Sequence, residues 1–400
     1  MNNNDHETAY RWYVLTLAAL THTFVAAMPL MCLPVLFQEI SNDLGLSLVQ
    51  IGVVWGLVSL PGVVTSLAGG MIGDRFGVRR TLTIICGLAG ITSALRGCSI
   101  NFLTLSATMF LFGMVRQMIP MNVHKTCGLW FSSRQLGLAN GVVSMGMALG
   151  FMAGSMLSAT FLSPWLGGWR NVLFFYGAIC LGLTLPWHFL RPASGELKHS
   201  SESRSARSLR QTLVDVMQIK AVWLLGLALF GISGCVQGTL GYLPLYLRGI
   251  GWAQTAADGT LAAFHGVSLL CVIPLALWSD RPGARKRVLL ITTLMLILGV
   301  VLLALVNSVM IWGAVIIAGF ARDGFMAIFM TTVIEIKGIG SAYAGTAIGL
   351  VMSVMGLGNL LAPPLGNSLA GMSPGWPFLF WALLAAAGLY SLHLALSPES

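Results

Sequence analysis

Twelve mostly apolar stretches follow one another along this chain, and each is about as long as the roughly 20 residues that a helix needs to cross a bilayer. A barrel strand would be about half as long, so helices are the elements that satisfy the backbone groups of such stretches. The sequence therefore predicts an all-α membrane protein with twelve transmembrane helices. The stretches lie near residues 12–37, 48–72, 80–97, 102–128, 136–162, 169–190, 220–247, 254–278, 287–306, 310–334, 341–370 and 375–395.

The composition also predicts a surface that faces lipid. Hydrophobic residues make up 56% of the chain and charged residues 9%, whereas a soluble domain usually carries about 25% charged residues. The net charge is +9, but its distribution argues against nucleic acid as a partner. If both termini are cytoplasmic, most Lys and Arg residues fall in the cytoplasmic loops, while Arg96, Arg170 and Arg248 fall in the outer loops. This positive-inside pattern sets the orientation, and we expect a bacterial inner membrane.

The second half of the chain repeats the first. Arg116 and Arg322 each lie near the middle of an apolar stretch, 206 positions apart, and the same step relates Gly113 to Gly319. Each half contains six spans, so the two halves keep the same orientation in the membrane. The step also relates a charged loop in the first half to one in the second: Asp74, Arg75, Gly77 and Arg79 correspond to Asp280, Arg281, Gly283 and Arg285.

The repeat predicts two pseudo-symmetric six-helix bundles, formed by residues 1–190 and 220–400. Residues 191–219 are Ser-rich and charged, which indicates a flexible cytoplasmic linker. The third and sixth spans of each half have no central charge, so we expect them to face lipid. The first and fourth spans contain polar residues, which predicts that they line a shared central cavity. Short loops and two self-complementary halves are compatible with a monomer, which is the oligomeric state that we expect.

Arg116 and Arg322 are the main candidates for contact with a solute. An arginine in hydrocarbon costs at least a few kcal/mol on the lowest insertion scales. Matching arginines in repeated halves therefore indicate a site for something negatively charged near the bilayer midplane. The alternative is a structural ion pair or a bond to backbone carbonyls. Asp323 is the only candidate acid that we expect deep in the membrane, and one acid cannot neutralise two arginines in opposite halves.

Other polar and aromatic residues in the spans extend this candidate site. Polar side chains within a membrane either contact a substrate or hold neighbouring helices together. The candidates for substrate binding are His22, Asn122, Gln237, Asn359, Trp55 and Tyr242. The candidates for proton coupling are Asp323, His22 and His265. Each has a structural alternative: a histidine packed in the core, Tyr242 at the lipid interface, or Asp323 holding Arg322 in place.

The charged loop at residues 70–80, with its degenerate copy at residues 279–286, resembles the signature loop of the major facilitator superfamily. Its pattern is Gly, three residues, Asp-Arg, one residue, Gly, one residue and two basic residues. The resemblance covers the whole chain and implies the major facilitator fold with its twelve helices. Charged pairs in such a loop can hold a bundle in one conformation, so we expect a conformational latch. Its candidate residues are Asp74, Arg75, Arg79, Asp280 and Arg281.

A second resemblance concerns the fourth and fifth spans. Trp130-Phe131, followed by residues 138–141 and Gly150, is similar to the corresponding region of organic-anion and monocarboxylate porters in this superfamily. Gly141, Gly150 and Gly154 also match the front half of the antiporter motif of drug exporters, but Ser155 and its neighbours replace the Pro and Gly-Gly that should follow. Close helix packing is another explanation for these glycines.

These observations predict a secondary active transporter that moves a small, carboxylate-like organic anion by alternating access, coupled to protons or to a counter-anion. One alternative is an exporter of amphipathic or cationic compounds. Another is a membrane sensor or receptor that transports nothing. The sequence contains no recognisable nucleophile–base set, and its seven cysteines form no CxxC or His/Cys cluster of metal-ligand spacing. We therefore expect neither enzyme activity nor a metal or cofactor.

Overall fold

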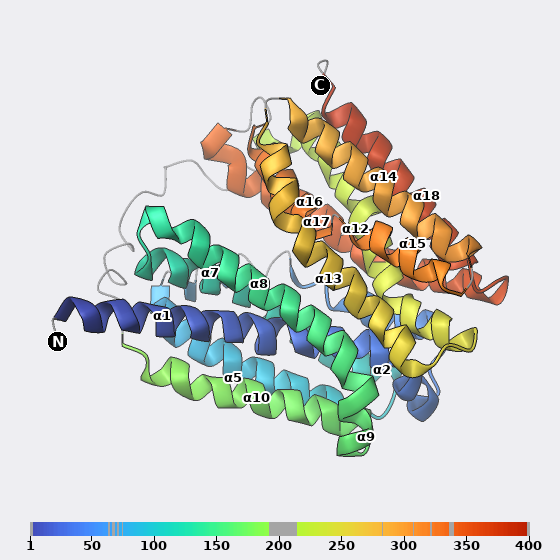
Figure 1. The fold of residues 1–400 in the computed structure, drawn as a ribbon, viewed down its shortest axis with the longest axis horizontal. Coiled ribbons are helices and arrows are strands. Elements are labelled where there is room, and N and C mark those ends of the chain that lie inside the picture. The colour runs from blue at the N-terminus through green and yellow to red at the C-terminus, as the bar shows by residue number, and fades with distance from the viewer. Residues whose placement is uncertain are drawn as a thin grey trace. The chain divides into compact units, whose positions relative to one another are not determined.

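The computed structural model describes residues 3–62, 65, 69, 72–73, 75–191, 214–281, 283–306, 308–320, 322–335 and 340–397 (Figure 1). Every regular element in these ranges is a helix. Eleven helical segments within them are long and apolar enough to cross a membrane. The expected second span begins as the shorter apolar helix Leu48–Leu57 and continues into residues that are described only in part. The predicted all-α, multi-span membrane fold is confirmed.

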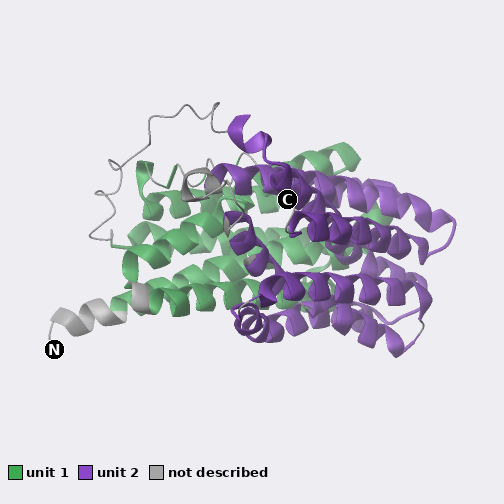
Figure 2. Ribbon diagram, turned by 90° about the horizontal axis from the view of Figure 1, so that it is seen from above, with its two compact units in different colours: residues 1–45, 64–203 green, residues 46–63, 204–400 purple. Residues whose placement is uncertain are grey.

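The helices form two compact units, which Figure 2 shows in different colours. Unit 1 contains residues 1–45 and 64–203, and unit 2 contains residues 46–63 and 204–400. Unit 1 comprises α1 (Asn3–Thr21), the π-helix η1 (His22–Ala27), α2 (Met28–Leu44), α5 (Val78–Gly97), α6 (Phe102–Arg116), α7 (Ile119–Trp130), α8 (Ser133–Leu157), the π-helix η2 (Ser158–Leu162), α9 (Ser163–Leu166) and α10 (Trp169–Phe189).

Unit 2 is also entirely helical in its described part. It comprises α3 (Leu48–Leu57), α12 (Lys220–Gly249), α13 (Gln254–Ser279), α14 (Ala284–Leu305), α15 (Met310–Gly319), α16 (Arg322–Glu335), α17 (Gly340–Ser368), the 3-10 helix η3 (Leu369–Gly371) and α18 (Trp376–Ala395). Thus α3, which precedes most of unit 1 in the sequence, packs with the C-terminal helices α12 and α17. The domain boundaries at residues 190 and 220 stay a prediction, because most of the linker lies outside the described residues.

Glycines set the distance between several helices of unit 1. A Cβ atom on Gly150 of α8 would lie 2.6 Å from the Cβ of Ala27 and 2.7 Å from the carbonyl oxygen of Thr23. A Cβ atom on Gly154 would lie 3.0 Å from the Cα of Met28. The backbones of α8, η1 and α2 therefore approach closely only because these positions lack a side chain. Packing accounts for Gly150 and Gly154 of the partial antiporter motif without an export function, whereas a Cβ atom on Gly141 would meet nothing within 4 Å.

All three arginines expected in outer loops belong to helices instead, and Arg170 lies in the first turn of α10. Arg96 lies within α5 and is fully buried, where its guanidinium stands 3.7 Å from the centre of the Phe112 ring. It also donates to Pro29 O at 2.8 Å and to Ser93 Oγ at 2.8 Å. The expectation of a loop position for Arg96 was therefore wrong, because α5 continues to Gly97 and places this side chain among apolar neighbours.

Arg248 lies in the last turn of α12, where it pairs with Asp258 of α13. The Asp258 side chain is fully buried, and that of Arg248 is only 11% exposed. Asp258 is therefore another acid within an apolar segment, which the sequence analysis did not single out. A buried carboxylate is tolerated when a cation and good hydrogen bonds accompany it.

The third and sixth spans of each half are tied together at one end by a basic side chain. In unit 1, Arg79 at the start of α5 donates from Nη1 to Leu190 O, just after α10, at 2.9 Å. In unit 2, Lys286 at the start of α14 donates from Nζ to Leu396 O, just after α18, at 2.8 Å. Carbonyls at a helix C-terminus have no partner within the helix, and basic side chains satisfy them.

Candidate functional site

Arg116 stands where a membrane-spanning helix is interrupted. The apolar segment Phe102–Trp130 consists of α6, which ends at Arg116, and α7, which begins at Ile119. Gln117 and Met118 form the turn between them, and Pro120 occupies the first turn of α7. A proline fits there because the first amides of a helix have no partner within the helix. The break leaves the positive end of α7 next to a cationic side chain.

A second interrupted helix meets this break. The first span changes from α1 into the π-helix η1 at His22 and returns to α-helical geometry at Met28, followed by Pro29. Arg116 Nε donates to the carbonyl oxygen of Ala26, the penultimate residue of η1, at 2.8 Å. Single π-helical turns are frequent at functional sites. The bond fixes the Arg116 guanidinium against the irregular part of the first span.

Two histidines lie close together in the same part of unit 1. The rings of His22 and His124, on η1 and α7, meet edge to face with their centres 5.5 Å apart. His22 Nδ1 lies 3.2 Å from Val143 O, and His124 Nδ1 lies 3.0 Å from Asn140 Oδ1. His22 Nε2 is buried and has no hydrogen-bond partner among the described residues. His124 and Asn140 were missed by the sequence analysis.

Arg322 occupies the corresponding break in unit 2. The span Met310–Ile334 contains α15, which ends at Gly319, and α16, which begins at Arg322. The guanidinium and the carboxylate of Asp323 form an ion pair, with Nη1 and Oδ1 2.9 Å apart. Their side chains keep 21% and 31% of their accessible surface, so the pair is only partly buried. The interruption that the structure describes here is the turn at Phe320. Both predicted arginines therefore lie close to interruptions of matching helices.

Ser268 of α13 holds the beginning of α16 in place. Its hydroxyl donates to Asp323 Oδ2 at 2.8 Å and accepts from the backbone N–H of Asp323 at 2.9 Å. The same carboxylate accepts from Arg322, so one serine orients the pair and satisfies an amide at the helix N-terminus. His265 lies one turn earlier on α13 and is fully buried.

Trp55 and Gln237 exchange two hydrogen bonds between α3 and α12. The indole Nε1 of Trp55 donates to Gln237 O at 2.7 Å, and Gln237 Nε2 donates to Trp55 O at 3.3 Å. Gly241, one turn further on α12, makes room for the indole, because a Cβ atom there would lie 2.5 Å from Trp55 Cδ1. Trp55 and Gln237, both predicted to bind substrate, therefore contact each other within unit 2.

The three remaining predicted substrate-binding residues have protein partners. Asn122 is fully buried and donates to Gly69 O at 3.0 Å. Asn359 Oδ1 accepts from Ser233 Oγ at 2.8 Å. The Tyr242 hydroxyl donates to Pro374 O at 3.2 Å, while its ring packs among the aromatic side chains that follow Gly375. These contacts give each residue a structural role, and their role toward a solute stays a prediction.

The predicted latch is described only in part. Asp74 lies outside the described residues. Arg75 is exposed, with its guanidinium 5.5 Å from the centre of the Phe76 ring. Arg79 donates to Leu190 O, and Asp280 and Arg281 are exposed in the turn between α13 and α14. A conformational role for these residues stays a prediction.

The arrangement defines a class of protein: an all-helical membrane protein whose repeated halves both have a broken helix with an arginine at the break. Among the described side chains, no group of three or more His, Cys, Asp or Glu residues is placed to hold a metal ion. The profile of the Major Facilitator Superfamily matches residues 19–337 and 260–400. The chain belongs to this superfamily, and it is a secondary transporter rather than an enzyme.

Several transporters are similar to this chain at low sequence identity. A probable sulfoacetate transporter of Cupriavidus necator is 23% identical over 93% of this chain and 91% of its own length. A probable nitrate/nitrite antiporter of Thermus thermophilus is 24% identical over 98% and 93%. A hexuronate transporter of Bacillus subtilis is 28% identical, over 28% of this chain and 26% of its own length.

Solved structures of transporters share the fold. A nucleoside transporter matches with a TM-score of 0.82 at 13% identity, over 96% of this chain and 100% of that chain. A bacterial homologue of the human lysosomal transporter Spinster, in an inward-facing and occupied conformation, matches with a TM-score of 0.75 at 16% identity, over 96% and 97%. At these identities the similarity establishes the architecture alone.

Proposed function

We propose that this chain transports a small organic anion, of the carboxylate or sulfonate type, and that Arg116 and Arg322 recognise its negative charge. The observation that supports this proposal is the position of both arginines at breaks in matching membrane helices. Discontinuous helices supply free backbone groups and helix ends to bound ions and substrates in secondary transporters. A guanidinium adds charge-assisted, bidentate hydrogen bonds that suit a carboxylate or sulfonate.

The breaks also explain how a positive charge is kept inside an apolar bundle. Arg116 donates to a carbonyl of the π-helix η1, and Arg322 pairs with a carboxylate that Ser268 orients. Both side chains are only partly buried. A cation in this setting is already oriented, so an anion binds without first ordering a long side chain.

The relatives support the chemical class. The names of the three relatives described above refer to sulfoacetate, nitrate or nitrite, and hexuronate, all of which are anions. They include both organic and inorganic anions, and their identities to this chain are low. The arginines favour an anion for this chain as well. A ligand screen would identify the size and the acidic group of that anion.

An exporter of amphipathic or cationic compounds is the first rival. Its sequence support was the glycine pattern of the fifth span, and Gly150 and Gly154 are required there by helix packing. Two intramembrane arginines also repel a cationic solute. The second rival, a sensor that transports nothing, predicts ligand binding without movement of the ligand across a membrane.

Three residues are proposed for the coupling of transport to protons. Asp323 is the part-exposed acid beside Arg322, and His22 and His265 are buried near the broken helices. The ring of His22 contacts the ring of His124, so two imidazoles that can accept a proton lie side by side. If these residues couple transport to protons, substitution of His22 or Asp323 should abolish accumulation of the solute against its gradient. Exchange of labelled solute across the membrane should continue.

The first experiment is a thermal-shift screen of the purified protein. The ligands are small carboxylates, sulfonates, nitrate and a set of lipophilic cations. A ligand that binds the folded state alone raises the melting temperature according to its occupancy. We expect carboxylates or sulfonates to raise it and cations to leave it unchanged, whereas stabilisation by the cations alone would favour the exporter.

The matched variants are Arg116→Gln, Arg322→Gln and Arg80→Gln. Arg80 is exposed at the start of α5, so its substitution removes one positive charge without touching either break. The shift produced by the anion should disappear in the first two variants and persist in the third. If it persists in all three, the arginines at the breaks do not recognise the ligand.

A further inference from the structure

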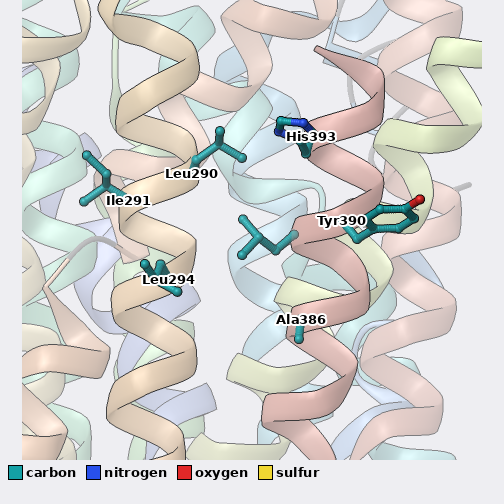
Figure 3. Close-up of a pocket in the computed structure, with 7 residues that line it drawn as sticks. Leu290, Ile291, Leu294, Ala386, Tyr390 and His393 are labelled. Carbon is teal, nitrogen blue, oxygen red and sulfur yellow. The ribbon is translucent and has the colours of Figure 1, made fainter. Parts of the chain in front are cut away.

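An apolar groove lies between α14 and α18 of unit 2, and its lining residues come from these two helices. Leu290, Ile291 and Leu294 of α14 line one wall, and residues of α18 line the other: Ala386, Leu389, Tyr390 and His393. Figure 3 shows Leu290 and His393 on facing sides of the space between the two helices. The groove has a volume of about 400 Å³. Both helices belong to spans that the sequence predicts to face lipid.

The groove has one polar end. The bond from Lys286 to Leu396 O shows that the start of α14 lies beside the end of α18. Arg287 is exposed on α14 at the positions three, four and seven residues before Leu290, Ile291 and Leu294, so it shares their helical face. His393, also exposed, lies at this end of α18. The guanidinium of Arg287 and the imidazole of His393 therefore lie at one end of the apolar groove.

The corresponding helices of unit 1 leave no such space at their closest approach. A Cβ atom on Gly90 of α5 would lie 2.8 Å from Gly177 O of α10, and a Cβ atom on Gly177 would lie 2.9 Å from Gly90 O. The two backbones are thus nearly in contact, as Figure 1 shows for α5 and α10 running side by side. In unit 2 leucines occupy the facing walls instead. The groove is therefore a property of this pair of helices and not of the repeated fold.

We propose that the groove between α14 and α18 binds an anionic phospholipid, with an acyl chain along the leucines and the phosphate at Arg287 and His393. An apolar channel alone accepts the tail of any lipid. The charge complementarity at its end selects an anionic headgroup, because a guanidinium donates strong paired hydrogen bonds to phosphate. Long basic side chains near a helix end reach the headgroup layer in this way. The site is independent of the transported solute.

Native mass spectrometry of the full-length protein tests the site. The delipidated protein is titrated with phosphatidylglycerol and with phosphatidylcholine of the same acyl chains. We expect at least one phosphatidylglycerol to remain bound at collision energies that remove phosphatidylcholine. Ala386→Phe fills the groove and should lower the retained phosphatidylglycerol several-fold. The adjacent Ala387 is exposed and does not line the groove, so Ala387→Phe is the matched control and should bind as the wild type does.

A second pair of variants separates the headgroup from the tail. Arg287→Gln should abolish the preference for phosphatidylglycerol over phosphatidylcholine, whereas Arg80→Gln, at the equivalent helix start in unit 1, should keep it. Equal retention of both lipids by the wild type overturns the proposal, and so does equal loss in the Ala386 and Ala387 variants. A lipid-free dimer that Ala386→Phe dissociates also overturns it, because a second copy of the chain then covers the groove.

Discussion

Arg116 Nε donates a hydrogen bond to Ala26 O at 2.8 Å, and this bond joins two interruptions of membrane helices. Ala26 belongs to the π-helix of the first span, and Arg116 is the last residue of α6. A π-helical turn shifts the backbone hydrogen bonds by one residue, so its carbonyls are available to other donors. The arginine is therefore part of the structure of unit 1 as well as a candidate for contact with a solute.

Replacement of Arg116 by an apolar side chain of similar length should destabilise the protein. Arg116→Met removes the donor to Ala26 O, and loss of a buried hydrogen-bond partner costs about 1–3 kcal/mol. The melting temperature in detergent, measured without ligand, should fall, whereas Arg80→Met at an exposed position should leave it unchanged. An unchanged melting temperature for Arg116→Met would show that this bond adds nothing to stability.

Ser268→Ala should impair transport through its effect on Asp323. The substitution removes the hydroxyl that contacts both the carboxylate and the backbone N–H of Asp323, which leaves the ion pair with Arg322 less well oriented. We expect the transport rate at saturating solute to fall several-fold.

The matched control for this prediction is Ser353→Ala. The Ser353 hydroxyl donates to Gly349 O, one turn earlier in its own helix, so its loss leaves the break untouched. Equal rates for wild type and Ser268→Ala in proteoliposomes would show that the orientation of Asp323 is unimportant.

Gly241→Ala should loosen the contact between α3 and α12. The added methyl group would lie 2.5 Å from Trp55 Cδ1, so the indole must move and its bond to Gln237 O is strained. Overpacking of this kind costs about 1–3 kcal/mol. The melting temperature should fall, and the effect should be absent in a Trp55→Ala background.

The control glycine lies on the same helix. A Cβ atom on Gly249 meets nothing within 4 Å, so Gly249→Ala should be neutral or slightly stabilising. If both glycine variants melt at the same temperature, the indole of Trp55 does not determine the packing of α3.

The sequence predicted the helical spans and the position of both arginines within them, because apolar length and an internal repeat can be read directly from the chain. The helix breaks were less accessible. Pro120 marks the start of α7 and is a signal that could have been read. The break before Arg322 lies among Gly319 and apolar residues, which are equally at home in a continuous helix.

Contacts between distant residues explain the remaining differences. His124 of α7 contacts Asn140 of α8, 16 positions further along the chain, so their contact depends on how the two helices meet. Arg96 is buried because its guanidinium packs on the ring of Phe112 in the next helix and donates to the carbonyl oxygen of Pro29. Asp258 could have been noticed as an acid within an apolar stretch, but its pairing with Arg248 depends on how α12 and α13 meet.

Uptake into proteoliposomes tests the central claim most directly. The solute is the anion with the largest thermal shift, and the variants are Arg116→Gln, Arg322→Gln and the control Lys220→Gln, at an exposed position at the start of α12. Loss of a charge-assisted contact worth about 1.5–3 kcal/mol predicts a decrease of at least about tenfold in kcat/KM for each of the first two variants. The control should transport like the wild type. Wild-type uptake by both folded variants at the helix breaks would contradict recognition of the anion by these arginines.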